Sequence, residues 1–365
     1  MQKFVPVYEP SITDRELAYV TDAVKSGWIS SIGEYITEFE RKFAGFIGVK
    51  YAVAVSNGTA ALHLALASLG ITHGHEVIVP DLTFIATANA VTYTGAKPVF
   101  ADIDPEHWCI DPEDIVRKIT PHTKAIIPVD VYGHPAEMDR IMAIANDYGL
   151  YVVEDAAEAH GAEYKGKKIG SFGNFGIFSF YGNKILTTGE GGMLTTDDPQ
   201  LYTRALELRD HAMSKEKRYW HIDIGFNYRM TNLQAAIGLA QLERIEELLR
   251  RKLAIFQWYA ESLGKRTDFR LNPQAPWAKN VYWMVCLLLD KRTRISRDDL
   301  IVQLRSRGID SRPFFYPLTH MPMYKGHAPN RVAHDISQCG INLPSGYGLD
   351  QETVRHIGQE ILHIL

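Results

Sequence analysis

The chain of 365 residues has few cysteines, no long apolar segment and no excess of one charge. Its three cysteines, Cys109, Cys286 and Cys339, lie far apart. They form no CxxC pair and no disulfide framework, so we expect a reducing, cytoplasmic location. The longest apolar run, residues 281–289, is far shorter than the roughly 18 residues that a transmembrane helix needs. The first ten residues, MQKFVPVYEP, lack the basic and then apolar pattern of a secretion signal.

The balance of charge and the missing glycine motifs argue against further classes of protein, namely nucleic-acid, membrane and dinucleotide binders. With 39 basic and 43 acidic side chains, the formal net charge is −4, which argues against a partner made of nucleic acid or membrane lipid. The P-loop pattern GxxxxGK[ST] is absent, and no GxGxxG follows a predicted strand, so a plain NAD-binding domain is not favoured. The apolar share of 46% and the charged share of 22% are typical of folded proteins, and disorder is therefore excluded.

Short β-rich runs alternate with helical patterns over the first two thirds of the chain. Helices are predicted at residues 12–26, with Thr13 as N-cap, and at residues 35–47. Strands are predicted at residues 51–55, 76–80, 97–100, 124–129, 151–155, 175–181 and 191–196. Short apolar strands separated by helices predict an α/β fold with a mostly parallel sheet covered by helices. In such folds the ligand site forms at the carboxyl ends of the strands.

The pattern changes after residue 230. Apolar residues at three- and four-residue steps predict one long helix over residues 231–263. A strand at 282–289, a helix capped by Ser296 and a closing helix from Asp350 follow. We expect a large domain over residues 1–240 and a smaller C-terminal α/β domain over 241–365, since about 150 residues per domain is usual.

The segment SNGTAALHLAL, residues 56–66, carries a candidate phosphate site. It is a small polar turn between a predicted strand and a predicted helix. Backbone N–H groups and the helix dipole favour an anion there. Gly58 would let the backbone approach the ligand, and Thr59 would add a hydroxyl. The alternative is an ordinary N-capped helix that binds nothing.

The segment VVEDAAEAHGA, residues 152–162, ends a predicted strand with carboxylates. One interpretation is that Asp155 faces a cofactor, because it stands at the carboxyl end of the strand. A second is a metal site made by Glu154, Asp155, Glu158 and His160, although no second histidine stands at ligand spacing. A third is a solvated strand end.

The segment FSFYGNKILTTGEGGML, residues 178–194, places Lys184 in a polar loop between apolar β-rich runs. Burial lowers the pKa of a lysine side chain and lets it form a Schiff base, whereas most lysines are only surface residues. A phosphate turn, then a carboxylate, then a lysine is the set that pyridoxal 5′-phosphate (PLP) requires. The turn holds the phosphate, the carboxylate keeps the ring nitrogen protonated and the lysine binds the aldehyde.

These segments, with EVIVPDLTFIATANAV and GFNYRMTNLQAAIGLAQLE, resemble the DegT/DnrJ/EryC1/StrS family of nucleotide-sugar aminotransferases, which are fold type I PLP enzymes. The resemblance runs from Pro6 to Leu343. Residues 28–31, 218–232 and 311–324 are similar to the subgroup that forms GDP-perosamine.

The resemblance implies roles for individual residues. It makes Lys184 and Asp155 catalytic, with Phe84 stacked on the cofactor ring and Asn227 reaching the phosphate of a neighbouring subunit. The implied cofactor contacts are Gly58, Thr59, Ala60, Phe84, Asp155, Glu158, Ser179, Lys184 and Asn227. Glu158 departs from the wider family, in which glutamine is commoner. The implied sugar-nucleotide contacts are Trp28, Ser30, Ser31, Tyr316 and His320, although Trp28 and Tyr316 are equally compatible with core packing. No metal is implied.

The expected function is transfer of the amino group of L-glutamate to the 4-keto group of GDP-4-keto-6-deoxy-D-mannose. The product would be GDP-perosamine, a precursor of lipopolysaccharide O-antigen, made by a homodimer with shared sites. One alternative is another UDP- or dTDP-linked 4-keto or 3-keto sugar. A related dehydratase is a second, but those enzymes resemble sequences with histidine in place of Lys184. A third is a non-catalytic regulatory protein with a PLP fold.

Overall fold

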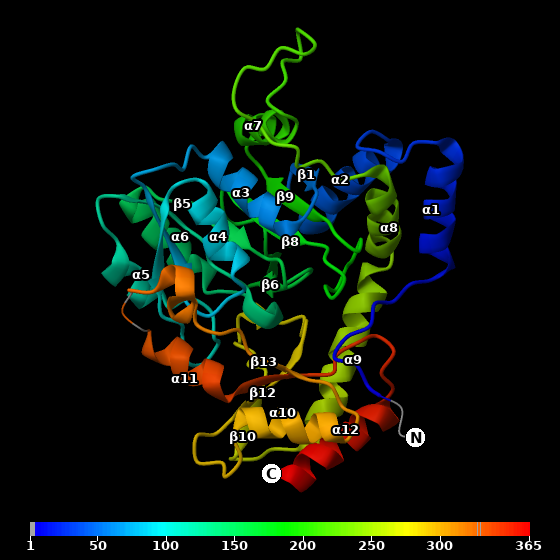
Figure 1. Cartoon of the computed structure of the whole chain (residues 1–365), viewed down its shortest axis with the longest axis vertical. Helices are drawn as coiled ribbons and strands as arrows, with labels where there is room; N and C mark the ends of the chain where they lie inside the picture. Colours follow the sequence, from blue (N-terminus) through cyan, green and yellow to red (C-terminus); the bar gives the residue numbers. More distant parts are fainter. Residues whose placement is uncertain (1–3, 327, 329) are drawn as a thin grey trace.

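The computed structural model describes residues 4–326, 328 and 330–365, so the first three residues of the N-terminal segment considered above lie outside it. Its centre is a seven-stranded sheet in the order β1-β9-β8-β5-β4-β2-β3 (Figure 1). Only β9 runs antiparallel to its neighbours in this sheet, so the predicted mostly parallel α/β fold is confirmed. The strands are β1 (Tyr51–Val55), β2 (Glu76–Pro80), β3 (Lys97–Ala101), β4 (Thr123–Ile126), β5 (Tyr151–Asp155), β8 (Phe175–Ser179) and β9 (Gly192–Thr196).

Both faces of this sheet are buried under helices. Along β1, Ala52 and Ala54 pack into one core cluster, and Val53 and Val55 pack into another on the opposite face. Side chains of a strand alternate between faces, so continuous apolar strands need cover on both sides. One face is covered by α2 (Glu34–Ile47), α5 (Pro112–Lys118), α6 (Met138–Tyr148) and α8 (Asn232–Leu242). The other is covered by α3 (Gly58–Ser68), α4 (Ala86–Tyr93) and α7 (Pro199–Arg209). Helix α1 (Asp14–Ser26) packs on α8.

The C-terminal part has a separate antiparallel sheet in the order β10-β12-β14-β13. Its strands are β10 (Phe269–Leu271), β12 (Val285–Leu289), β13 (Arg312–Pro313) and β14 (Gly340–Leu343). The surrounding helices are α9 (Ile245–Leu263), α10 (Arg297–Ser306), α11 (Arg331–Cys339) and α12 (Gln351–Ile364). The start of the chain joins this part, because Val5 bridges to Ile309 and the Ser345 N–H donates to the Val7 carbonyl over 2.8 Å. A small third sheet contains β6 (Glu163–Tyr164), β7 (Lys167–Lys168) and β11 (Ala278–Lys279).

Several predicted elements differ from the structure in their bounds. The strands expected over 124–129 and 175–181 already end at Ile126 and Ser179. The single helix expected over residues 231–263 is two helices, α8 and α9, separated at Glu243 and Arg244. Arg244 donates hydrogen bonds to Glu16 over 2.9 Å and to Ser11 over 2.9 Å, so contacts distant in sequence hold the break. The strand expected over 282–289 begins only at Val285, and Tyr282, at the start of the expected range, has a left-handed φ of +51° that a strand does not allow.

The predicted helix caps are confirmed at Thr13 and Ser296, each of which accepts a hydrogen bond from an N–H of its own helix. The closing helix predicted from Asp350 is α12, and Asp350 is its N-cap. The domain boundary near residue 240 stays a prediction. Among the residues described here, no helix combines the length and apolar character that crossing a bilayer requires.

Candidate active site

Four strands of the central sheet deliver polar side chains to one edge. Asn57 follows β1, Thr83 follows β2, Asp155 ends β5 and Ser179 ends β8. These strands all point the same way, so their carboxyl ends meet. The four side chains line a cavity of about 670 Å³ together with Lys184.

The first wall of this cavity is the amino end of α3. Asn57 caps the helix, and its side chain accepts a hydrogen bond from the Ala60 N–H over 2.8 Å. The first turn of a helix has N–H groups without intrahelical acceptors, which face an anion favourably. A Cβ on Gly58 would lie 2.8 Å from the Cβ of Ser179, so only glycine fits here. Thr59 and Ala60 line the same wall, as predicted for a phosphate turn.

The second wall carries Asp155, which is 5% exposed. Its carboxylate accepts a hydrogen bond from the Thr87 hydroxyl over 2.8 Å. Burial raises the pKa of Asp155, and the hydrogen bond from Thr87 opposes that rise. A buried carboxylate needs a positive or hydrogen-bonding partner. The protonated ring nitrogen of PLP would be such a partner.

The third wall carries Lys184, which is 9% exposed. Its Nζ lies 3.4 Å from Glu158 Oε1 and 3.9 Å from the centroid of the Trp283 ring. The Tyr132 N–H donates to the other oxygen of Glu158 over 2.8 Å. Burial raises the pKa of Glu158, whereas the charge of Lys184 lowers it. The lysine amine therefore lies in a desolvated pocket between an acid and an aromatic face.

These residues fit PLP. The glycine-lined helix terminus suits a phosphate, Asp155 suits a protonated ring nitrogen and the Lys184 amine suits an aldehyde. Phe84 is 54% exposed and lines the same cavity, where a flat ring would cover it.

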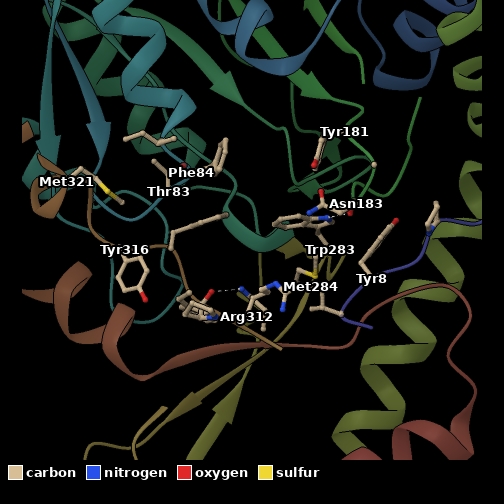
Figure 2. A pocket seen from close by; sticks show the side chains of 18 residues that line it. Tyr8, Thr83, Phe84, Tyr181, Asn183, Trp283, Met284, Arg312, Tyr316 and Met321 are labelled. Carbon is tan, nitrogen blue, oxygen red and sulfur yellow. Dashed lines mark hydrogen bonds between the residues drawn. The ribbon is translucent and has the colours of Figure 1, made fainter. Parts of the chain in front are cut away.

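A second cavity of about 680 Å³ adjoins the first. Thr83, Phe84, Tyr181, Asn183 and Trp283 line both cavities. Figure 2 shows this second cavity, with Arg312 and Tyr316 on the far side from Tyr181. Of the predicted sugar-nucleotide residues, Tyr316 is therefore beside the candidate cofactor site.

The other predicted residues lie elsewhere. Trp28 is 57% exposed, and its carbonyl accepts a hydrogen bond from the Asn232 side chain over 2.7 Å. His320 packs edge-on against the ring of His334, at 4.9 Å between centroids. Ser30, Ser31 and Asn227 also lie outside the linings of both cavities. Asn227 bridges to Asp210 and accepts a hydrogen bond from Arg229 over 3.3 Å.

The four residues weighed as a metal site are not gathered into one. The Glu154 carboxylate accepts hydrogen bonds from the N–H groups of Gly170, Phe172 and Gly173, at 2.6–2.8 Å. The His160 ring is fully buried against aromatic rings, and burial lowers its pKa to about 3. In the described part of the chain, no three His, Cys, Asp or Glu residues form a group that could hold a metal ion.

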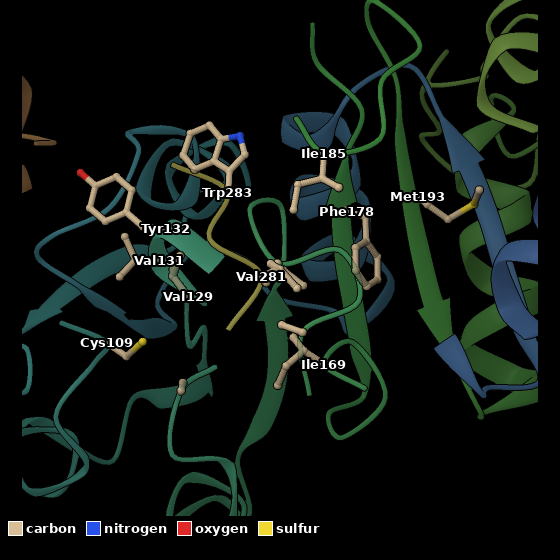
Figure 3. Packing of buried hydrophobic residues seen from close by; sticks show 14 of the residues in the cluster. Cys109, Val129, Val131, Tyr132, Ile169, Phe178, Ile185, Met193, Val281 and Trp283 are labelled. Carbon is tan, nitrogen blue, oxygen red and sulfur yellow. The ribbon is translucent and has the colours of Figure 1, made fainter. Parts of the chain in front are cut away.

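Sequence reasoning missed three residues that shape this site: Thr87, Asn183 and Trp283. Thr87 stands in the segment that the resemblance covers, one helical turn after Phe84 and thus facing the same side, which is a usable signal. Trp283 lies in an apolar run that predicts only a buried strand. In Figure 3 its ring lies beside that of Tyr132, within the core that supports the site.

The model of the DegT/DnrJ/EryC1/StrS aminotransferase family matches residues 10–362. The chain belongs to this family. Among relatives of this aminotransferase, the GDP-perosamine synthase of Escherichia coli O157:H7 is 47% identical, over 98% of both chains. The GDP-perosamine synthase of Caulobacter vibrioides is 46% identical, over 97% of this chain and 96% of the relative. The crystal structure of S. venezuelae DesV in complex with a ketimine intermediate is similar, with a TM-score of 0.93 and 33% identity, covering 99% of this chain and 98% of DesV.

Family membership confirms two predictions. The protein is an aminotransferase, and its cofactor is PLP. The geometry agrees with this result, because a lysine amine, a carboxylate and the amino end of α3 line one cavity.

Proposed function

We propose that this aminotransferase moves the amino group of L-glutamate to the 4-keto carbon of GDP-4-keto-6-deoxy-D-mannose and so forms GDP-perosamine. One observation carries the proposal. The cavity with Lys184 and Asp155 lies in a chain that is 47% identical, over nearly its whole length, to a GDP-perosamine synthase. When bound, PLP supplies an electron-accepting ring that takes up the amino group from one substrate and passes it to the next.

Lys184 has two tasks in this proposal. Its Nζ would hold the cofactor through its aldehyde. When freed by the amino acid, the amine would take the proton from the substrate α-carbon and serve as the acid and base of the transfer. With the keto sugar it would move a proton in the opposite direction. Glu158, 3.4 Å from the amine, gives it a hydrogen-bond acceptor inside the cavity.

The two buried acids, Asp155 and Glu158, act on different atoms of the site. Asp155, fixed by Thr87, keeps the ring nitrogen protonated and so keeps the ring a good electron acceptor. Glu158, fixed by the Tyr132 N–H, lies on the side of Lys184. Because burial raises the pKa of Glu158, this acid can hold a proton and avoid repelling a negative oxygen of the cofactor.

The second cavity is the proposed site of the sugar nucleotide. It opens from the cofactor cavity past Phe84 and Trp283, so a sugar reaching Lys184 would leave its diphosphate and base there. The Arg312 guanidinium pairs with Asp310 and is 54% exposed at its side chain, and it supplies the positive charge that a diphosphate needs. Tyr316, 51% exposed, supplies a ring face for the base.

We also propose a homodimer with shared sites that works in the cytoplasm. The segment between α7 and α8 projects from the body (Figure 1) and exposes apolar side chains at Tyr219, Trp220, Ile222 and Ile224. Large exposed apolar groups are typical of interfaces. Asn227, at the base of this segment, would then reach the cofactor phosphate of the partner. The boundary near residue 240, between a large cofactor-binding domain and a small domain, is part of the same proposal.

A substrate panel tests the reaction. Purified protein with PLP and glutamate is incubated with nucleotide-linked 4-keto and 3-keto sugars carrying GDP, UDP or dTDP, and products are read by mass spectrometry. We expect an amino sugar only from the GDP-linked 4-keto sugar. Conversion of a dTDP-linked 3-keto sugar alone would refute the substrate, and a deoxygenated product would refute aminotransfer.

A lysine variant tests the site. Lys184→Ala should bind PLP without a covalent bond and lose transamination by at least the order of 10² to 10⁴ that acid–base catalysis contributes. Lys25→Ala, which removes an exposed lysine of α1 outside the cavity, is the control and should react normally. Wild-type turnover by Lys184→Ala would exclude this lysine from the reaction.

A further inference from the structure

Lys252, on α9, carries a buried amine next to the active-site loop. It is 1% exposed, and its Nζ donates hydrogen bonds to the Trp283 carbonyl over 2.9 Å and to the Ser345 carbonyl over 2.6 Å. The same Nζ faces two aromatic rings, 4.7 Å from the centroid of Tyr8 and 5.0 Å from that of Tyr347. Across the described residues, no ion pair joins this amine to a carboxylate. Carbonyl dipoles and ring faces therefore stabilise the charge.

The groups around Lys252 also hold the loop that carries Lys184. Three successive carbonyls of this loop each accept a hydrogen bond from an aromatic side chain. The Trp283 indole donates to the Asn183 carbonyl over 2.7 Å, the Tyr8 hydroxyl to the Lys184 carbonyl over 2.6 Å and the Tyr347 hydroxyl to the Ile185 carbonyl over 2.8 Å.

These two sets of contacts share the same three aromatic residues. The amine of Lys252 contacts the backbone of Trp283 and the rings of Tyr8 and Tyr347, which belong to three segments far apart in the sequence. Trp283 reaches the active site a second time, because its ring lies 3.9 Å from the Lys184 Nζ.

We propose that Lys252 is a positioning residue: through Tyr8, Tyr347 and Trp283 it fixes the backbone at residues 183–185 and so sets where the Lys184 amine lies. This inference rests on the proposed role of Lys184. It assigns Lys252 no contact with substrate or cofactor.

Burying the Lys252 amine costs free energy, because the charged form loses water. Burial lowers the pKa of Lys252 to about 7, so the protein gives up part of the hydration of the charge. Lys252→Met keeps the length of the side chain but leaves the Trp283 and Ser345 carbonyls without their donor, so a loss of stability alone does not separate a structural role from a positioning role. A merely structural lysine would leave the orientation of the bound cofactor and the reaction rate of the folded variant unchanged. A positioning lysine would change both, because misplacing a catalytic group by 1 Å can cost about 10² in rate.

The test compares Lys252→Met with Arg250→Met, which removes an exposed cation from the same helix. Holoenzymes are examined by visible circular dichroism, which reports how the chain orients the bound cofactor, and by the rate at which glutamate bleaches the lysine-bound cofactor in a single turnover. In Lys252→Met we expect a weakened dichroism band and a bleaching rate lower by about 10- to 100-fold. Arg250→Met should match wild type in both.

Two smaller changes keep the inference testable if Lys252→Met does not fold. Tyr8→Phe and Tyr347→Phe each remove one hydroxyl and keep the ring beside Lys252. Loss of one hydrogen bond should slow bleaching by about 2- to 12-fold and weaken the same dichroism band. Folded variants with wild-type dichroism and bleaching would overturn the inference. If wild-type protein shows no bond between Lys184 and PLP after borohydride reduction and peptide mapping, the proposed function itself fails, which is a separate result.

Discussion

His134 should make the protein sensitive to mild acid. Its ring is 1% exposed, and burial lowers its pKa to about 4. One ring nitrogen pairs with the Pro135 carbonyl over 2.8 Å, and Nε2 accepts a hydrogen bond from the Ala275 N–H over 3.1 Å. The neutral ring therefore joins the loop after β4 to the loop after β10. A protonated ring could no longer accept from Ala275.

The size of the effect follows from the two pKa values. The pKa of His134 is about 4 in the folded protein and about 6.5 in the unfolded chain, so between these values the unfolded state binds more protons. The stabilisation is complete above pH 6.5 and is lost as the pH falls toward 4. Between pH 7 and pH 5 the loss amounts to about 2 kcal/mol from this one group.

The assay is the free energy of unfolding in urea, measured at pH 7 and at pH 5 for wild type and His134→Gln. Glutamine can accept the Ala275 N–H but does not titrate, so the fall between the two pH values should be about 2 kcal/mol smaller in the variant. His363→Gln, at an exposed position of α12, is the control and should behave as wild type. Equal falls in wild type and His134→Gln would refute the reasoning.

Three further predictions concern the site. Gly58→Ala places a Cβ 2.8 Å from a neighbouring side chain and should weaken PLP binding by about 1–3 kcal/mol in a fluorescence titration; unchanged affinity would contradict the tight phosphate turn. Thr87→Val removes the hydrogen bond that lowers the pKa of Asp155, so this pKa should rise and the single-turnover reaction with glutamate should slow by about 10-fold or more. Thr92→Val, on the same helix, is the control and should show no such effect. Asp81→Asn should raise KM for the sugar nucleotide and leave the glutamate half-reaction unchanged, because the buried Asp81 carboxylate binds Thr319, in the segment beside the second cavity, over 2.8 Å. An equal loss in both half-reactions would contradict the assignment of this segment to the sugar nucleotide alone.

The parts of the site that are local in sequence could be predicted. Gly58, Asp155 and Lys184 each lie within a few residues of a strand end, so a run of apolar residues followed by a polar turn locates them. The strand ends also predict which edge of the sheet they share. The sheet itself was predictable for the same reason, since its strands are short apolar runs separated by helices.

Contacts between distant segments could not be predicted in this way. The periodic apolar pattern continues from α8 into α9, and the break between them depends on Arg244 reaching Glu16. Trp283 stands in an apolar run with no polar signal, and its place beside Lys184 depends on contacts with a loop distant in sequence, where its indole donates to the Asn183 carbonyl. Residues whose role arises from such packing need coordinates.

The loop around Lys184 has a consequence for the order of folding. Its carbonyls accept hydrogen bonds from Tyr8 and from Tyr347, which lie on opposite sides of the loop in the sequence and far from it. During synthesis this set of hydrogen bonds can close only after residue 347 has been made, because domains fold as their residues emerge from the ribosome. A nascent chain would thus not hold the reactive amine in its final place before that point, and an enzyme circularly permuted within residues 8–347 would meet the same requirement in a different order.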